Sequence, residues 1–124
     1  MTKKTTIILS VCVCAIAVGS FLFFNKAGAP LSDAGIVIFY SDNCPHCLNV
    51  EKFLEDNKVS EKIAYTRKSV DNDQKNIEEL IAKDRSCGIK EEELGFIPLL
   101  WEKATNKCFV GDEDVINFFK EKIK

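Results

Sequence analysis

Two cysteines three positions apart, Cys44 and Cys47, follow a short apolar run (residues 36–40) and a polar turn. The run is typical of a strand that is buried on both faces, and the turn places the cysteines where a helix is expected to begin. Two thiols on a first helical turn can close into a disulfide and reopen while the rest of the chain stays folded. A Cys-x-x-Cys pair in this position is typical of thiol–disulfide exchange.

The two residues between the cysteines favour the same interpretation. Pro45 suits the first turn of a helix, because its missing N–H would have no helical partner there. His46, the one histidine of the chain, can add a positive charge or a hydrogen bond to the Cys44 sulfur. The helix N-terminus also favours the Cys44 thiolate. We therefore predict that Cys44 attacks and that Cys47, which lies on the packed side of the helix, resolves the intermediate and forms the redox disulfide with it.

A metal site and an inert structural disulfide are the other interpretations of this pair. Zinc normally takes four ligands, often from two such pairs. Cys87 and Cys108 are isolated from each other in the sequence and form no second pair of this kind. We expect no metal ligands, and the alternative function is a thiolate metal-binding or non-catalytic binding module.

The N-terminal part of the chain differs in composition from the rest. Residues 5–24 carry no charge, and a helix of this length spans roughly 30 Å, the thickness of a bilayer's hydrocarbon core. Lys3 and Lys4 precede this segment, so the positive-inside rule predicts a cytoplasmic N-terminus and an exported domain. The alternatives are a signal peptide cleaved at residues 27–29 and a lipoprotein site at Cys12. Each places the domain on the extracytoplasmic side, in the periplasm or at the cell surface.

These features divide the chain into a signal anchor (residues 1–26), a linker (27–34) and a folded domain (35–124). Cys12 and Cys14 fall within the apolar segment, and we assign them no function. The net charge of the chain is −2, so the composition does not indicate a nucleic-acid partner.

Together with the strand at 36–40, the remaining pattern of the domain predicts one further strand, a hairpin and three helices. The expected helices cover residues 45–57 and 71–86 and the end of the chain from Gly111–Asp112, and the expected further strands cover 63–70, 96–101 and 107–110. We expect 63–70 at a sheet edge, where Arg67 and Lys68 would discourage pairing. Asp71 and Gln74 resemble a capping box, Asp112 is the expected N-cap of the last helix, and 90–93 is expected to be a solvated loop.

Pro98 lies at the front of an apolar stretch. Because proline cannot donate to a ladder of strand hydrogen bonds, it belongs at the start of a strand. Ile97–Pro98 is a candidate cis peptide bond, and the alternative is an ordinary trans proline. Beside Cys44, a cis bond would present the Ile97 backbone as a short docking ledge for an extended chain.

Four segments together resemble the glutaredoxin-like members of the thioredoxin superfamily: residues 39–41, 44–47, 97–98 and 111–112. The resemblance covers about residues 35–124. It implies an α/β fold with a four-stranded mixed sheet, the element order βαβαββα and helices on both faces. The Cys-Pro-His-Cys form resembles that of the periplasmic oxidases that donate disulfides.

The resemblance also implies a site and its partners. Cys44 would be the nucleophile, Cys47 the resolving thiol and Pro98 the cis-proline. The substrate-binding residues that it implies are Tyr40, Ile97, Pro98, Gly111 and Asp112. The expected substrates are protein thiols and disulfides, with glutathione as a candidate co-substrate, a separate redox partner and no resident cofactor.

Cys87 and Cys108 are the other two cysteines of the domain. If Cys44 pairs with Cys47, Cys87 and Cys108 can form a second disulfide between the end of the second long helix and the return strand of the hairpin. The alternative is a pair of buried free thiols. The sequence leaves both arrangements open.

Overall fold

The computed structural model describes residues 35–124, and these contain the four-stranded mixed sheet that the family resemblance implied. Its strands are β1 (Ile36–Tyr40), β2 (Thr66–Ser69), β3 (Leu99–Glu102) and β4 (Lys107–Val110). They lie in the order β2-β1-β3-β4, with β1 parallel to β2 and the other two pairs antiparallel. β1 is therefore an inner strand, and β2 lies at an edge as expected.

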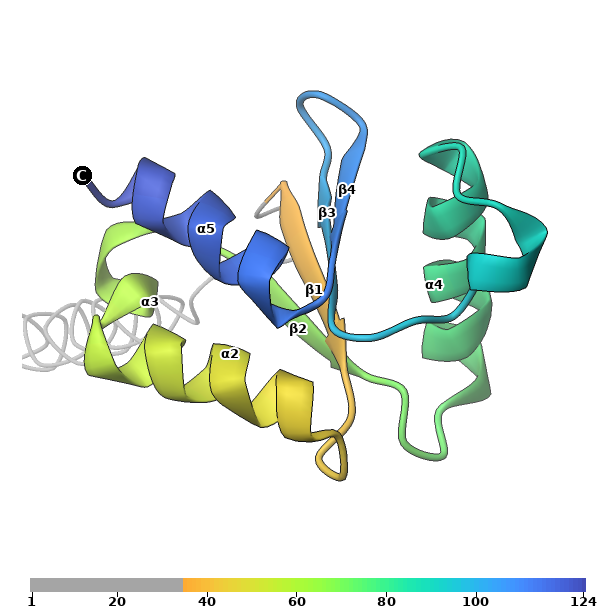
Figure 1. The fold of residues 1–124 in the computed structure, drawn as a ribbon, viewed down its shortest axis with the longest axis horizontal. Coiled ribbons are helices and arrows are strands. Elements are labelled where there is room, and N and C mark those ends of the chain that lie inside the picture. The colour runs from red at the N-terminus through yellow and green to blue at the C-terminus, as the bar shows by residue number, and fades with distance from the viewer. Residues whose placement is uncertain (1–34) are drawn as a thin grey trace, which may run out of the picture. The chain divides into compact units, whose positions relative to one another are not determined.

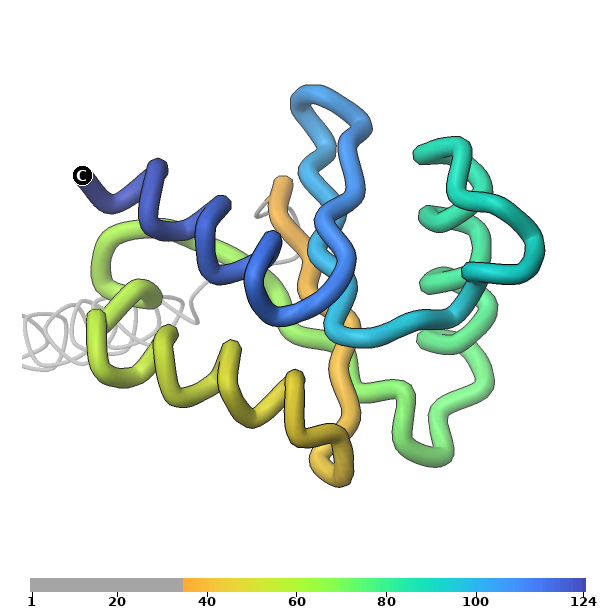
Figure 2. The backbone as a smooth tube through the Cα atoms, viewed as in Figure 1, coloured from red at the N-terminus to blue at the C-terminus, as the bar shows by residue number. Residues whose placement is uncertain are grey.

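Helices cover both faces of this sheet (Figure 1). α2 (Pro45–Asp56) and α5 (Asp112–Lys122) lie on one face together with the short α3 (Val59–Lys62), and α4 (Gln74–Ser86) lies on the other. Figure 2 shows that the chain leaving α4 turns back along this helix, through the 3₁₀ turn η1 (Glu91–Glu93), before it enters β3. The start of β3 lies near the end of β1, because Leu99 pairs with Phe39. The start of α2 lies near the same end, because α2 follows β1 after a short turn.

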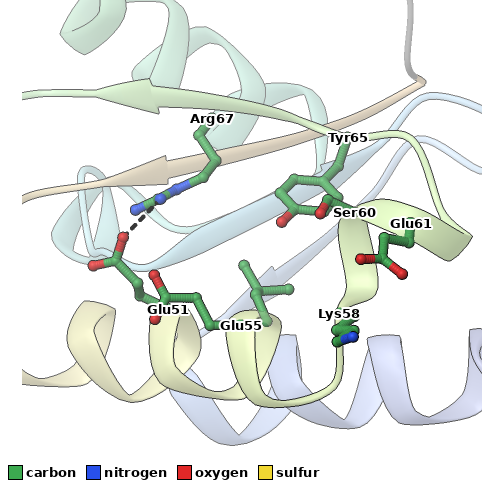
Figure 3. Close-up of a pocket in the computed structure, with 8 residues that line it drawn as sticks. Glu51, Glu55, Lys58, Ser60, Glu61, Tyr65 and Arg67 are labelled. Carbon is green, nitrogen blue, oxygen red and sulfur yellow. Dashed lines mark hydrogen bonds and ion pairs between the residues drawn. The ribbon is translucent and has the colours of Figure 1, made fainter.

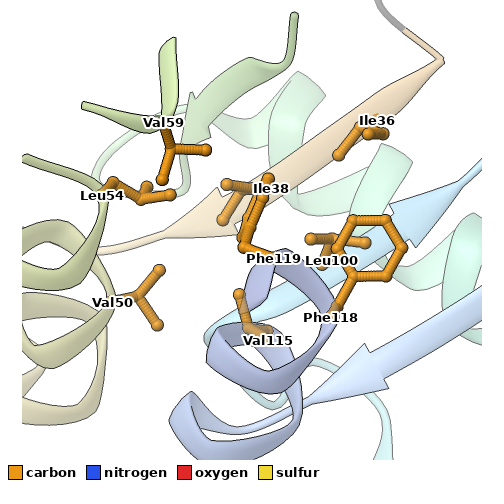
Figure 4. Close-up of a cluster of buried hydrophobic side chains, with 9 residues drawn as sticks. All are labelled: Ile36, Ile38, Val50, Leu54, Val59, Leu100, Val115, Phe118 and Phe119. Carbon is orange, nitrogen blue, oxygen red and sulfur yellow. The ribbon is translucent and has the colours of Figure 1, made fainter. Parts of the chain in front are cut away.

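The larger hydrophobic core lies between the sheet and the helices α2 and α5 (Figure 4). Its buried residues are Ile36, Ile38, Val50, Leu54, Val59, Leu100, Val115, Phe118 and Phe119. Successive side chains of a strand point to opposite faces, so Phe39 of β1 points the other way. There it meets Leu99 and Leu80 of α4 in a smaller core. α4 is thus held to the sheet by fewer buried side chains than α2 and α5 are.

A disulfide also ties α4 to the sheet. It joins Cys87, the residue that follows α4, to Cys108 of β4, and the two cysteines are 21 positions apart. This is one of the two arrangements that the sequence left open. It compensates in part for the small core beneath α4.

We expect loss of this disulfide to lower the free energy of unfolding by about 3 kcal/mol, because the cross-link restricts the unfolded chain. Urea unfolding of Cys87→Ser/Cys108→Ser should be compared with that of the parent chain. Both should carry Cys44→Ser, which prevents formation of the other disulfide. Equal unfolding midpoints, with both thiols free by mass mapping in the parent, would contradict the prediction.

Several predicted element boundaries were wrong. The strand predicted over 63–70 is confined to Thr66–Ser69, the residues that pair with β1, and the short helix α3 before it was not predicted. The capping box predicted at Asp71 does not form: α4 begins at Gln74, and the Asp73 carboxylate accepts a hydrogen bond from the Asn76 N–H at 3.0 Å. The predicted loop at 90–93 contains the turn η1, whose side chains are exposed.

The predicted signal anchor (residues 1–26) and linker (27–34) lie outside the described residues, as do Cys12 and Cys14. Within residues 35–124, no helix has the length and apolar character needed to cross a membrane. The anchor therefore stays a prediction from the sequence.

Candidate active site

The two cysteines of the motif lie at the start of α2 in different surroundings. Cys44 is the N-cap residue, and its sulfur accepts a hydrogen bond from the Cys47 N–H at 3.4 Å. Cys44 is partly exposed, whereas Cys47 is only 4% exposed, and both are free thiols. An incoming molecule can therefore reach the sulfur of Cys44 more readily than that of Cys47.

Burial also separates the two thiols chemically. It raises the pKa of the Cys47 thiol to about 12, and the hydrogen bond with the Cys44 side chain adds to the rise. Because the thiolate is the nucleophilic form, Cys47 is unreactive at neutral pH while Cys44 is reduced. The arrangement favours Cys44 as the sulfur that attacks first.

The turn before Cys44 is held by Asp71. One oxygen of this carboxylate accepts a hydrogen bond from the Ser41 hydroxyl and the other from the Asp42 N–H, both at 2.7 Å. The Ser41 hydroxyl accepts from the Asn43 N–H at 3.1 Å, and the Ser41 carbonyl accepts from the Cys44 N–H at 3.3 Å. The hydrogen bonds from Ser41 and Asp42 lower the pKa of the Asp71 carboxyl below its usual range. Sequence reasoning missed this role, because Asp71 and Ser41 are 30 positions apart.

We expect Asp71→Asn to destabilise the domain at pH 7 and to lose this effect in acid. Because the pKa of Asp71 is lower in the folded chain than in the unfolded chain, its charge contributes fully above about pH 4 and progressively less as the pH falls through the folded value. Urea unfolding at a series of pH values measures the difference from wild type. Asp42→Asn is the matched control, since Asp42 contributes its backbone N–H to this network. A difference for Asp71→Asn that is constant down to about pH 2 would contradict the assignment.

His46 is paired with the first residue of α5. Its Nδ1 lies 3.0 Å from Oδ1 of Asp112, and the Asn49 side chain donates to Oδ2 at 2.7 Å. These two hydrogen bonds, first that of Asn49 and then that of His46, lower the pKa of the Asp112 carboxyl. Asp112 is not the N-cap that was predicted, because Gly111 takes that position with φ +89°, where glycine is favoured. The Asp112 carboxylate instead joins the starts of α2 and α5.

The Ile97–Pro98 peptide bond is cis, as expected. The Ile97 carbonyl oxygen lies 3.9 Å from the Cys44 sulfur, within reach of the thiol as a donor. The Pro98 carbonyl accepts a hydrogen bond from the Gly111 N–H at 2.8 Å. The fold therefore brings the segment before β3 and the start of α5 to the same place as the first cysteine.

Tyr40 belongs to a different group of side chains. Its ring lies under the guanidinium of Arg67, with 4.1 Å from Cζ to the ring centroid, and Arg67 also pairs with Glu51 of α2 at 2.8 Å. The alternation along β1 places Tyr40 on the same face as Ile38, toward α2. Tyr40 thus has packing partners of its own, and its role in substrate binding stays a prediction.

A cavity of about 290 Å³ lies among α2, α3 and the segment that leads into β2 (Figure 3). It is lined by Glu51, Leu54, Glu55, Lys58, Ser60, Glu61, Tyr65 and Arg67. None of these is a predicted site residue. Thiol exchange needs an accessible sulfur rather than a cavity, so the reaction is not placed here.

The metal-binding alternative would need ligands in addition to Cys44 and Cys47. Within residues 35–124, no group of three or more His, Cys, Asp or Glu side chains is arranged to hold a metal ion. Structural zinc sites normally use four ligands, and Cys44 and Cys47 would supply two.

The likeness of this chain to known proteins is found in its structure rather than in its sequence. No protein-family model matches the chain, and no curated protein sequence matches it significantly. Among solved structures, the chain is similar to the crystal structure of a wheat glutaredoxin, with a TM-score of 0.49 and 20% sequence identity over 73% of this chain and 74% of that one. The strand order, the strand directions and the helices on both faces are themselves consistent with a thioredoxin- or glutaredoxin-like α/β fold.

Proposed function

We propose that this chain is a thiol–disulfide oxidoreductase that uses Cys44 and Cys47. The contrast between the two sulfurs at the start of α2 carries the proposal. Cys44 is partly exposed and accepts a backbone N–H at the positive end of the helix, whereas Cys47 is buried and held as a thiol. Cys44 would therefore react with the substrate first, and Cys47 would react in the second step.

The reaction would proceed through a mixed disulfide. The Cys44 thiolate attacks one sulfur of a substrate disulfide, so that a Cys44–substrate bond forms and the other substrate sulfur leaves as a thiolate. Cys47 then gives up its proton to that thiolate or to water, attacks the Cys44 sulfur and releases the second substrate thiol. The substrate gains two electrons, and the Cys44–Cys47 disulfide holds the oxidised site. The reverse sequence donates a disulfide.

The neighbouring residues would bind the substrate and adjust the equilibrium. The Ile97 backbone would pair with an extended polypeptide whose sulfur meets Cys44, and its carbonyl oxygen, 3.9 Å from the Cys44 sulfur, supports this role; the substrates would then be protein thiols and disulfides. Glutathione and a protein dithiol are the proposed electron donors. His46 would stabilise the Cys44 thiolate electrostatically when the imidazole is protonated, since its Nδ1 hydrogen bond is made with Asp112 and not with Cys44.

Replacing His46 with tyrosine should make the site less oxidising, because the variant loses the positive charge that stabilises the reduced form. We expect the reduction potential to fall by about 30 mV, a tenfold change in the equilibrium constant. Lys52→Gln is a matched control that removes a positive charge elsewhere on α2, where Lys52 pairs with Asp56. If the potential were the same in His46→Tyr and wild type, His46 would have no part in tuning the site.

Stoichiometric exchange tests the proposed function directly. The reduced full-length chain is mixed with a disulfide-bonded peptide, quenched in acid, alkylated and mapped by mass spectrometry. We expect a Cys44–Cys47 disulfide to form as two peptide thiols appear. Free Cys44 and Cys47 after incubation of the reduced chain with excess disulfide peptide, together with no transfer of the Cys44–Cys47 disulfide from the oxidised chain to the reduced peptide, would contradict the proposal.

We also propose that residues 5–24 anchor the chain in a membrane, with the folded domain on the extracytoplasmic side. The uncharged apolar segment and the preceding Lys3 and Lys4 support this orientation. Labelling intact cells with a membrane-impermeant maleimide tests it. Modification of Cys44 without cell lysis is expected, and labelling only after lysis would contradict the proposed location.

A further inference from the structure

Asp84 of α4 is a buried carboxylate whose environment costs stability. Asp84 is only 1% exposed, and its Oδ1 atom has no hydrogen-bond partner among residues 35–124. The other oxygen, Oδ2, accepts a hydrogen bond from the Gly95 N–H at 2.7 Å. Burial raises the pKa of this carboxyl, as expected for a charge that is removed from water. Because a buried, partly unsatisfied carboxylate is unfavourable, stability alone does not explain it.

The hydrogen bond from Gly95 leads directly to the candidate active site. Gly95 lies two positions before Ile97, whose carbonyl oxygen is 3.9 Å from the Cys44 sulfur. Gly95 has φ +81°, a conformation that favours glycine, so the chain is shaped at this point to turn toward β3. The next residue, Phe96, is 56% exposed and supplies little packing of its own.

The segment 95–98 is therefore held at two points. At its far end, the Pro98 carbonyl accepts a hydrogen bond from the Gly111 N–H. At its near end, the Asp84 carboxylate is the hydrogen-bonding partner of Gly95. Asp84 is itself fixed because α4 packs through Leu80 and is tied to β4 by the disulfide at Cys87. The chain between α4 and β3 runs back along the helix, as Figure 2 shows, and this places Gly95 beside Asp84.

We propose that Asp84 is a positioning residue of the redox site, which holds the Ile97–Pro98 segment against Cys44 through the Gly95 N–H. This inference rests on the proposed function, because it assigns the held segment to the binding of a polypeptide disulfide. Asp84 then acts on the binding of substrate. We expect the reactivity of Cys44 to be set mainly by the start of α2, because the Cys47 N–H lies 3.4 Å from its sulfur and the Ile97 carbonyl oxygen lies 3.9 Å away.

Two substitutions in the full-length chain separate these roles. Asp84→Leu has a similar size and removes the acceptor together with the unsatisfied oxygen, whereas Asp84→Asn keeps an acceptor for Gly95. For reduction of a disulfide-bonded peptide, we expect Asp84→Leu to raise KM about tenfold and to leave kcat within about twofold of wild type. The KM of Asp84→Asn should stay within about threefold of the wild-type value, because the asparagine oxygen can still accept the Gly95 hydrogen bond.

Two readouts do not require turnover. The Gly95 amide should exchange slowly with solvent in wild type, although its backbone lies near the surface. In Asp84→Leu it should exchange about tenfold faster. The rate at which iodoacetamide alkylates Cys44 should be the same in both proteins. Fast exchange at Gly95 in wild type would overturn the proposal even if Asp84→Leu failed to fold.

Glu78→Leu is the matched control, because it makes the same kind of replacement at an exposed position of α4, where the side chain pairs with Gln74 and not with Gly95. We expect its KM to stay at the wild-type value. An equal rise in KM for Glu78→Leu and Asp84→Leu, or no rise for Asp84→Leu, would overturn the inference while the proposed function stands. A wild-type chain that reduces no disulfide, with Gly95 protected, would instead contradict the proposed function.

Discussion

Replacing Cys44 with serine should abolish disulfide reduction by this chain, with a loss of at least about a thousandfold in turnover. A serine hydroxyl stays protonated at neutral pH, and the chain has no other partly exposed sulfur at the start of α2 among the described residues. Turnover is measured with a disulfide-bonded peptide and a thiol regenerating system. The double variant Cys12→Ser/Cys14→Ser is the control, because those thiols are assigned no function, and it should keep full turnover.

The companion variant Cys47→Ser should stop at a different step. Cys44 can still attack, but the resolving thiol is missing, so a covalent Cys44–substrate disulfide should accumulate and be visible as an added peptide mass. The high pKa of the Cys47 thiol fits this second role, because it delays attack by Cys47 until Cys44 is bonded to substrate. Trapping at Cys47 in a Cys44→Ser chain, with none at Cys44 in the Cys47→Ser chain, would reverse the assignment.

Phe119→Ala should cause the largest loss of stability of the substitutions considered, about 3–5 kcal/mol in the free energy of unfolding. Phe119 has no exposed surface and makes edge contacts with the rings of Tyr65 at 5.5 Å and Phe118 at 5.3 Å. Its removal leaves a cavity in the larger core, between α5 and the sheet. Small domains are stable by only about 5–15 kcal/mol, so a large part of the protein should unfold at moderate temperature.

Phe96→Ala is the matched control for this prediction. The side chain removed is the same, but Phe96 is 56% exposed, so we expect a change of less than about 0.5 kcal/mol. Urea unfolding followed by the fluorescence of Trp101, the one tryptophan of the chain, measures both variants. Equal losses for Phe119→Ala and Phe96→Ala would contradict the assigned core.

The parts of the site that could be predicted are those with a local sequence signal. The apolar strand 36–40, the two cysteines at a helix start and the proline at the front of β3 each show their role within a few residues. The inner position of 36–40 and the edge position of the strand that follows were predicted from the same kind of signal, whereas the order of all four strands came from the structure. For these features, local preference and the final fold agree.

The parts that could not be predicted are held by contacts between distant positions. Asp71 looked like a helix cap, but Ser41 and the turn before Cys44 bind its carboxylate, and Asp73 caps α4 instead. Asp112 looked like the cap of α5, and it binds His46, which is 66 positions away. Asp84 gave no signal at all, because a single acidic residue in a helix is ordinarily exposed.

The reduction potential of the Cys44–Cys47 pair tests the central claim most directly. The full-length chain is equilibrated with glutathione buffers, and each disulfide is quantified by alkylation and mass mapping, which separates this pair from Cys87–Cys108. The account predicts a reversible equilibrium at a potential between about −270 and −120 mV, with the Cys87–Cys108 disulfide more resistant, below about −300 mV. Cys44 and Cys47 that stay unpaired in every buffer, or that form a disulfide as resistant as Cys87–Cys108, would contradict it.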